Sequence, residues 1–318
     1  MTATSSPRRR RRPIYVESRI DATIDALWDA TQLPGSHQRW DLRFGRITYL
    51  PRADDEPQRF TYATTVAPGV TVAGTGESLG DRDRPDGTRW SGLRFWAADR
   101  RSIIEAGAGY WRYVPTDDGV RFLTRYDYRP RWGRLGELVD RVIFRPLFGW
   151  ATAWSFDRLR LWLEDGTPPE RSRDLAVAHA AAVGGLAGVF AYQGLVPKVW
   201  KVDVDEVAIW NGLGVSPGSA RKVVRAVGAI EAGFAVAAVA ASDKRWPFVI
   251  SIAAMPTLAI GAAKSDRSIL TKAFNPGSLG IAVVALAGVA LATRRGRPSG
   301  RRPLREAPDP QPPVEELP

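Results

Sequence analysis

Four long apolar stretches follow residue 170, and they constrain the fold of this chain more than any other feature of its sequence. They cover residues 175–196, 223–241, 246–263 and 277–293. Each is close to the roughly 17–25 residues that a helix needs to cross the hydrocarbon core of a bilayer. A bundle of buried soluble helices is the alternative, but such helices carry a polar stripe, and these stretches are apolar all round. The sequence therefore predicts four transmembrane helices.

Averages over the whole chain conceal this division. Mean hydropathy is −0.21, and 45 Lys and Arg against 34 Asp and Glu give a formal net charge of +11. Nine of the twelve tryptophans lie before residue 166, and the apolar stretches lie after it. We expect a basic N-terminus at 1–12, a folded domain at 13–165, a linker at 166–173, a membrane domain at 174–294 and an Arg- and Pro-rich tail at 295–318. Both terminal segments are expected to be disordered.

The basic residues beside the four stretches predict the orientation of the membrane domain. Twelve Lys and Arg flank the stretches on the side of both termini: Arg158, Arg160, Arg171, Arg173, Lys244, Arg245 and the six arginines between 294 and 305. Seven lie on the other side: Lys198, Lys201, Arg221, Lys222, Lys264, Arg267 and Lys272. Because the cytoplasmic side carries the excess, we expect a multi-pass protein of the plasma (inner) membrane with both termini cytoplasmic.

The sequence excludes several kinds of chemistry. There is no cysteine, and the two histidines, His37 and His179, form no metal-binding motif, so we expect neither a metal nor another cofactor.

The five arginines at 8–12 suit a nucleic-acid-binding arm or a lipid-facing tail. We favour the tail and expect no nucleic-acid partner, because no recognition helix or aromatic RNA platform accompanies the arginines.

The N-terminal half reads as a strand, short helices, a run of strands and a long helix. Ile14 to Ile20 alternates as a strand does, and Asp21 to Thr31 has apolar residues at helical spacing. Six further period-two segments lie between residues 43 and 128 and are separated by turn residues. The stretch Leu135 to Leu163 predicts a long helix, kinked at Pro146, that covers one face of the sheet. The predicted fold is an α+β helix-grip, with an interior cavity where strand glycines such as Gly74 and Gly107 make room.

Six side chains on these strands are candidates for lining that cavity. Three are acids that could act there, and three could orient the polar head of a ligand; they are Glu77, Glu105, Asp127, Tyr62, Tyr110 and Arg112. The alternative for each is an outward-facing strand residue or a cross-strand pair. We expect His37 to be a surface turn residue.

The order of these elements carries a resemblance to a known superfamily. With the opening Ile20-Asp21-Ala22-Thr23 and Gln38-Arg39-Trp40-Asp41 before the second strand, residues 13–165 resemble the START-like or SRPBCC superfamily, in its polyketide cyclase and dehydrase branch. Members hold lipids, polyketides, sterols or hormones, and some are cyclases or dehydratases. The resemblance therefore implies a cavity fold and leaves the function open.

The membrane half resembles a second family. Its motifs are Tyr192-Gln193-Gly194-Leu195-Val196-Pro197-Lys198, then Glu206, then Gly228-Ala229-Ile230-Glu231, and finally Phe274-Asn275-Pro276. Residues 174–294 look like the DoxX-like four-helix membrane family, although Ala191 stands where an aromatic residue is usual. The resemblance implies no established reaction for this branch.

Six polar residues of the membrane half are candidate site residues: Gln193, Lys198, Glu206, Glu231, Thr257 and Asn275. A carboxylate in mid-span is costly, so Glu231 has either a proton or ligand role or a hydrogen bond to Thr257 that fixes helix packing. Lys198 and Glu206 form either a polar gate with Asn275 or a snorkelling cation and a solvated acid.

We interpret the chain as a membrane-anchored binding protein for a hydrophobic small molecule, lipid or polyketide-like, at the cytoplasmic face. The main alternative is an enzyme, either a cyclase or dehydratase with Glu105 or Asp127 as acid and base, or a quinone-linked redox subunit. No nucleophile or tuned pair favours the enzyme. A structural membrane protein that recruits a partner, or a homo-oligomer, is the third alternative. The expected partners are the bilayer and the hydrophobic ligand.

Overall fold

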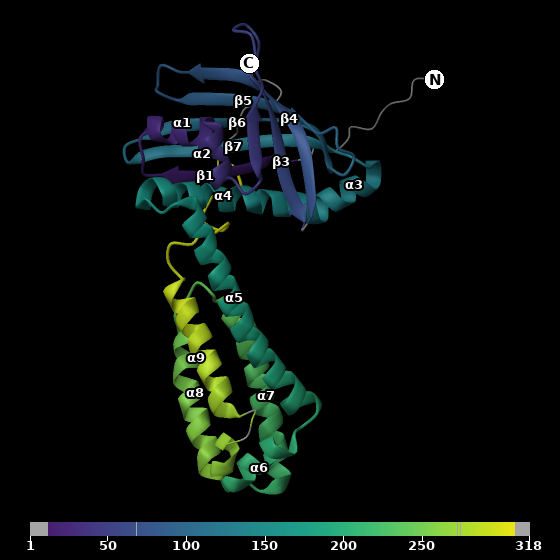
Figure 1. The fold of residues 1–318 in the computed structure, drawn as a ribbon, viewed down its shortest axis with the longest axis vertical. Coiled ribbons are helices and arrows are strands. Elements are labelled where there is room, and N and C mark those ends of the chain that lie inside the picture. The colour runs from purple at the N-terminus through teal and green to yellow at the C-terminus, as the bar shows by residue number, and fades with distance from the viewer. Residues whose placement is uncertain (1–11, 68, 272, 274, 309–318) are drawn as a thin grey trace. The chain divides into compact units, whose positions relative to one another are not determined.

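The chain folds into two compact units (Figure 1). The computed structural model describes residues 12–67, 69–271, 273 and 275–308. The first, the N-terminal unit, comprises the described residues up to Arg173 together with those from Pro298 onward, and the second, the membrane unit, comprises Asp174–Arg297.

A seven-stranded antiparallel sheet forms the N-terminal unit, in the order β1-β7-β6-β5-β4-β3-β2. Its strands are β1 (Ile14–Ile20), β2 (Arg46–Tyr49), β3 (Arg59–Ala67), β4 (Val70–Asp83), β5 (Arg89–Trp96), β6 (Ile104–Thr116) and β7 (Gly119–Pro130). Helices α1 (Ile24–Gln32) and α2 (Pro34–Trp40) lie between β1 and β2, and α3 (Gly133–Val139), the π-helical turn η1 (Asp140–Phe144) and α4 (Arg145–Asp165) follow the sheet. This is the predicted helix-grip.

The core lies between one face of the sheet and the second half of α4. Phe122 of β7 stacks on Phe156 of α4 with ring centroids 4.5 Å apart, and Trp40 closes the same core from α2. We call this face of the sheet the inner face. Because side chains alternate along a strand, the register of β7 with its neighbours assigns every other strand residue to the inner or the outer face.

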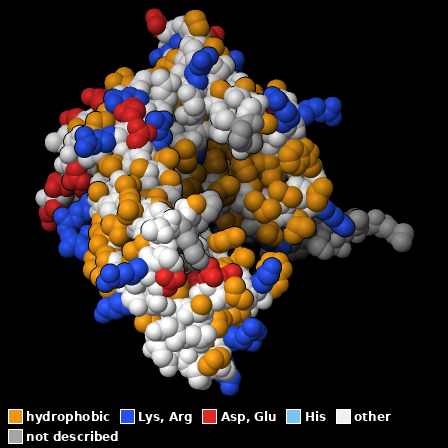
Figure 2. Space-filling view, turned by 60° about the horizontal axis from the view of Figure 1, so that its bottom comes forward, with side chains coloured by type: hydrophobic (Ala, Val, Ile, Leu, Met, Phe, Trp, Pro, Cys, Tyr) orange, Lys and Arg blue, Asp and Glu red, His pale blue; other side chains and the backbone are white. Residues whose placement is uncertain are grey.

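The beginning of the long helix differs from its prediction. Leu135, Leu138, Val142 and Leu147 were expected to cover the sheet, but each is more than half exposed, as is Ile143. These five residues are called the apolar strip below. Figure 2 shows the molecule with the bottom of Figure 1 turned forward, and hydrophobic side chains gather in patches on the face that it shows.

The described part of the C-terminal tail is folded, in contrast to the disorder expected from its composition. Leu304 pairs with Glu17 of β1 through two backbone hydrogen bonds of 2.9 and 2.8 Å, and the Ser299 amide donates to Asp157. The free edge of β1 supplies the hydrogen-bonding groups that composition does not reveal. Residues 1–11 and 309–318, also expected to be disordered, lie outside the described residues.

The described residues of the membrane unit form helices joined by short connections. It contains α5 (Pro169–Gly194), the π-helical turn η2 (Leu195–Trp200), α6 (Val204–Gly212), α7 (Pro217–Ala240), α8 (Trp246–Ser265), the 3-10 turn η3 (Arg267–Thr271) and α9 (Pro276–Ala292). Helix α5 begins at Pro169, inside the segment 166–173 that composition marks as a linker. In the part of the chain that the structure describes, three helices, α5 with η2, α7 and α8, are long and apolar enough to cross a membrane, and α9, the fourth predicted span, is apolar but shorter, at 17 residues.

Candidate functional site

Two glycines bring α5 and α7 into backbone contact. A Cβ added at Gly194 would lie 2.5 Å from the carbonyl oxygen of Gly228, and one added at Gly228 would lie 2.6 Å from the carbonyl oxygen of Gly194. Any side chain at either position would therefore force the helices apart, as at other close crossings of membrane helices.

This crossing positions a buried ion pair. Lys198 lies in η2, four residues after Gly194, and Glu231 lies in α7, three residues after Gly228. Lys198 Nζ donates to both carboxylate oxygens of Glu231, at 2.8 and 2.7 Å. Their side chains are only 10% and 14% exposed. Each charge therefore lies in a protein environment where loss of its partner would be costly.

A second carboxylate faces the same lysine. Glu206 lies in the first turn of α6, which the side chain of Asp203 caps, and its Oε1 is 3.7 Å from Lys198 Nζ. Burial raises the pKa of Glu206 and the charge of Lys198 opposes that rise. One ammonium thus stands between two carboxylates, and we call Lys198, Glu206 and Glu231 the Lys198 cluster. The cluster joins Lys198 and Glu206, which the sequence analysis considered together, with Glu231, which it considered apart from them.

The remaining membrane candidates serve other roles. Thr257 is exposed and donates to the Ala253 carbonyl of its own helix, whereas Glu231, its expected partner, binds Lys198. Asn275 accepts a hydrogen bond from the Ser278 amide as the N-cap of α9. Gln193 is half-buried beside Gly194.

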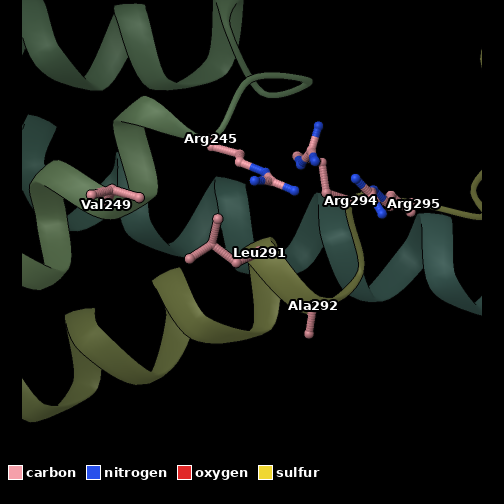
Figure 3. A pocket seen from close by; sticks show the side chains of 6 residues that line it. All are labelled: Arg245, Val249, Leu291, Ala292, Arg294 and Arg295. Atoms are coloured by element: carbon pink, nitrogen blue, oxygen red, sulfur yellow. The ribbon is translucent and has the colours of Figure 1, made fainter.

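Arginines gather at the opposite end of helices α8 and α9. A shallow pocket there is lined by Arg245, Arg294 and Arg295 together with Val249, Leu291 and Ala292 (Figure 3). The guanidinium of Arg294 donates to the Asp243 carbonyl. A rim of arginines above apolar side chains is the arrangement expected where spans meet anionic headgroups.

Five of the six cavity candidates in the N-terminal unit face outward. Glu77, Tyr110, Arg112 and Asp127 fall on the outer face by strand register, and Glu105 pairs at 2.7 Å with Arg129, which lies on that face. Glu77 is held by Arg59 at 2.8 Å and by Arg94, and these partners lower its pKa. Asp127 binds Arg145 at 3.1 Å. Arg112 stacks on Trp90, which also contacts Tyr110. For these residues the alternative of an outward-facing strand residue or a cross-strand pair describes the structure.

Tyr62 is the one cavity candidate on the inner face. Its ring lies over Gly74, just as the rings of Phe60 and Phe95 lie over Gly76 and Gly107. The glycines thus accommodate aromatic rings where the sequence led us to expect empty space. The three aromatic residues are only partly buried, while the helices pack against β1, β2 and β7. We call Phe60, Tyr62 and Phe95 the aromatic trough. Burial raises the pKa of Tyr62 to about 12, which keeps its hydroxyl neutral.

A buried polar cluster at one end of the trough was missed by the sequence reasoning. Asp41 binds the guanidinium of Arg43 through two hydrogen bonds of 2.9 and 2.6 Å, and His37 Nε2 lies 3.1 Å from the same carboxylate. Phe44 links the cluster to Tyr62, with ring centroids 5.6 Å apart. His37, expected on the surface, stacks on Trp40 instead.

The charges of this cluster are fixed by their neighbours. Burial alone would raise the pKa of Asp41, but Arg43 and the hydrogen bond from His37 bring it well below its usual range. At His37 burial lowers the pKa by more than the neighbouring Asp41 carboxylate raises it, so the histidine pKa lies below its ordinary value. The Asp-x-Arg spacing directly after Gln38-Arg39-Trp40 was the only sequence signal available. Among the described residues, no group of three potential ligands could hold a metal ion.

Comparison with known proteins assigns the class of the chain. Residues 187–288 match the DoxX-like family, and this segment contains Gly194, Gly228 and the whole Lys198 cluster. The uncharacterized membrane protein YndG of Bacillus subtilis (strain 168) is 44% identical over 186 residues, which are 58% of this chain and 69% of YndG. The chain is a membrane protein of the same family as YndG, and its residues 187–288 form a DoxX-like domain.

Solved structures resemble the chain over about half of its length. A STAR-related lipid transfer protein from Xanthomonas axonopodis is 19% identical, covers 47% of this chain and 84% of its own, and gives a TM-score of 0.37. The Zhui aromatase/cyclase from Streptomyces sp. R1128 is 14% identical, covers 47% of this chain and 96% of its own, and gives a TM-score of 0.35.

Proposed function

We propose that the chain is a membrane-anchored protein that binds a hydrophobic small molecule, lipid or polyketide-like, at the cytoplasmic face of the membrane. The observation that carries the proposal is the aromatic trough. Phe60, Tyr62 and Phe95 lie on the inner face of the helix-grip sheet, and all three are only partly buried. Apolar surface left open on an inner face is what an apolar ligand would cover.

The polar cluster at the end of the trough supports a ligand with a polar head. Arg43 and His37 lie beside Phe44, which contacts Tyr62. A neutral tyrosine hydroxyl and a few buried polar groups among aromatic rings form the kind of lining that orients an amphipathic molecule. The membrane helices on the same chain would keep this site near the bilayer in which such molecules dissolve, at a high effective concentration.

The two carboxylates expected to act as acid and base in the enzyme alternative do not face the inner side of the sheet. Glu105 pairs with Arg129 on the outer face, and Asp127, which is on the outer face by strand register, pairs with Arg145 of α4. Neither carboxylate is therefore available to a molecule on the inner face.

Two neighbouring aromatic residues of β5 allow a sharp test. Phe95 faces inward and Trp96 faces outward, and both are half-exposed. The full-length protein would be purified in detergent, and the small molecules extracted from it would be identified by mass spectrometry. We expect a hydrophobic compound that is depleted in Phe95→Ala and retained in Trp96→Ala.

Two outcomes would overturn the proposal. Equal recovery from both variants would mean that the compound binds elsewhere, such as among the membrane helices. Recovery of a chemically altered form after incubation with the purified protein would establish turnover, and with it the enzyme alternative.

A further inference from the structure

The apolar strip is an unusual surface for the outside of a folded domain. Leu135, Leu138, Val142, Ile143 and Leu147 are 68%, 57%, 63%, 60% and 57% exposed. Together they run along α3, η1 and the first turn of α4. Scattered single apolar residues on a surface are common, but a contiguous row marks an interaction site.

The π-helical turn keeps this row on one side of the helix. Leu135, Leu138 and Val142 follow the three- and four-residue spacing of an α-helical face, and Leu147 comes five residues later. A π turn adds one residue to the repeat, so five residues across η1 complete about one turn and return to the same face.

Polar groups hold the opposite side of η1 against the sheet. Asp140 is buried, accepts a 2.6 Å hydrogen bond from the Tyr128 hydroxyl and binds Arg145 at 3.0 Å. On this side Asp140 and Arg145 face inward beside the partly buried Val139 and Phe144, while the five aliphatic side chains of the strip face outward. This anchoring prevents the helix from turning its leucines into the core.

Positive charge surrounds the strip. Arg134 and Arg141 are exposed on the same segment, and residues 131–147 contain four arginines against Glu137 and Asp140. Arg12 also lies here, because Arg145 Nη1 donates to the Arg12 carbonyl at 2.9 Å. An occupant must therefore be apolar where it meets the strip and anionic around it.

We propose that the apolar strip is a membrane-docking surface that inserts into the interfacial region of an anionic lipid bilayer. An aliphatic helix face flanked by arginines fits acyl chains below phosphate headgroups, as interfacial helices do. A bilayer is also the one partner that this chain always has nearby, since its own helices span one. The inference goes beyond the proposed function because docking requires no bound ligand.

The cysteine-free chain is well suited to the test. Leu138→Cys and Val142→Cys would each be labelled with an environment-sensitive nitrobenzoxadiazole probe in the full-length protein, reconstituted in phosphatidylglycerol and phosphatidylcholine. Asp55→Cys, in the exposed loop before β3, is the control. We expect blue-shifted emission at 138 and 142, and several-fold stronger quenching by nitroxide-bearing lipids than at 55.

Varying the lipid charge and the protein-to-lipid ratio distinguishes an anionic bilayer from a second copy of the chain as the occupant of the strip. Quenching at 138 should weaken in pure phosphatidylcholine, and in the anionic bilayer with Arg134→Gln and Arg141→Gln combined. Quenching no stronger than at position 55, or insensitive to lipid charge, would overturn the proposal. The proposal would also be overturned if the emission wavelength changed with the protein-to-lipid ratio and the nitroxide-bearing lipids caused no quenching. A second copy of the chain would then cover the strip.

Discussion

The buried ion pair between Lys198 and Glu231 should contribute strongly to the stability of the membrane unit. Both side chains are largely shielded and each satisfies the other. Removing one partner leaves an uncompensated charge, so Glu231→Ala should lower stability by roughly 3–5 kcal/mol. Thermal unfolding of the detergent-purified protein would measure the loss. Thr257→Ala, at an exposed residue of α8, should change little.

A double variant distinguishes a pair from two separate contributions. Replacing Lys198 and Glu231 together by Met removes both charges, so the double variant should be more stable than either single replacement. Losses that simply add would contradict the pairing.

His37 predicts a pH dependence of the N-terminal unit. Its pKa is lowered by burial, so below its ordinary value near 6.5 the unfolded chain takes up a proton more readily than the folded one. Stability from this residue is therefore full above that value and is lost as the pH falls through it. Unfolding of wild type and His37→Gln, measured between about pH 8 and pH 5.5, should show a steeper decline in wild type. Parallel curves would contradict this account, since His179 is present in both proteins.

Sequence reasoning identified charged residues but not their partners. Lys198, Glu206 and Glu231 were each singled out, yet Glu231 was matched with Thr257 because depth was counted along straight helices. The glycine crossing and the π turn at 195–200 change which side chains meet, and neither follows from periodicity. On the sheet, both faces carry aromatic residues, Trp90 and Tyr110 outside and Trp111 and Tyr113 inside, so alternation alone did not distinguish the inner face.

At the level of elements, the α5–α7 crossing depends on the absence of side chains. In Gly228→Ala the new Cβ would lie 2.6 Å from the Gly194 carbonyl oxygen. Overpacking of this kind costs about 1–3 kcal/mol, and it should also lengthen the Lys198–Glu231 contact. Gly233→Ala in the same helix is the matched control, because nothing lies within 4 Å of its added Cβ. Thermal unfolding should separate the two variants, and equal stability would refute close contact at the crossing.

The predicted elements and their order were largely correct, because turn residues separate the strands and apolar periodicity marks the helices. Their packing was less predictable. The long helix was expected to cover the sheet along its length, but only the part around Ala153, Phe156 and Leu159 does so. An amphipathic pattern indicates that one face avoids water without indicating whether protein or lipid covers it. The tail was judged by composition, which cannot detect an open strand edge such as β1.

For the whole molecule, the basic residues that give the positive net charge do not all bear on the orientation of the membrane unit. Two of the arginines counted toward orientation serve the N-terminal fold: Arg158 is buried and donates to the Pro169 and Trp40 carbonyls, and Arg160 pairs with Asp157 and Glu164. Without them the bias is smaller but keeps its sign, because Arg245, Arg294 and Arg295 gather at one end of the bundle. Lys198 at the other end is neutralised by its cluster, which strengthens the asymmetry.

This asymmetry predicts the topology of the membrane unit. Lys201, after η2, should face the outside, and Asp243, between α7 and α8, should face the cytoplasm; both are exposed. In the cysteine-free chain, Lys201→Cys should react with a membrane-impermeant maleimide in intact cells, whereas Asp243→Cys should react only after permeabilisation. The reverse pattern would place the N-terminal unit outside the cell and remove the basis for a cytoplasmic ligand. Labelling of both positions in intact cells would mean that the chain inserts in two orientations, as a weak charge bias permits.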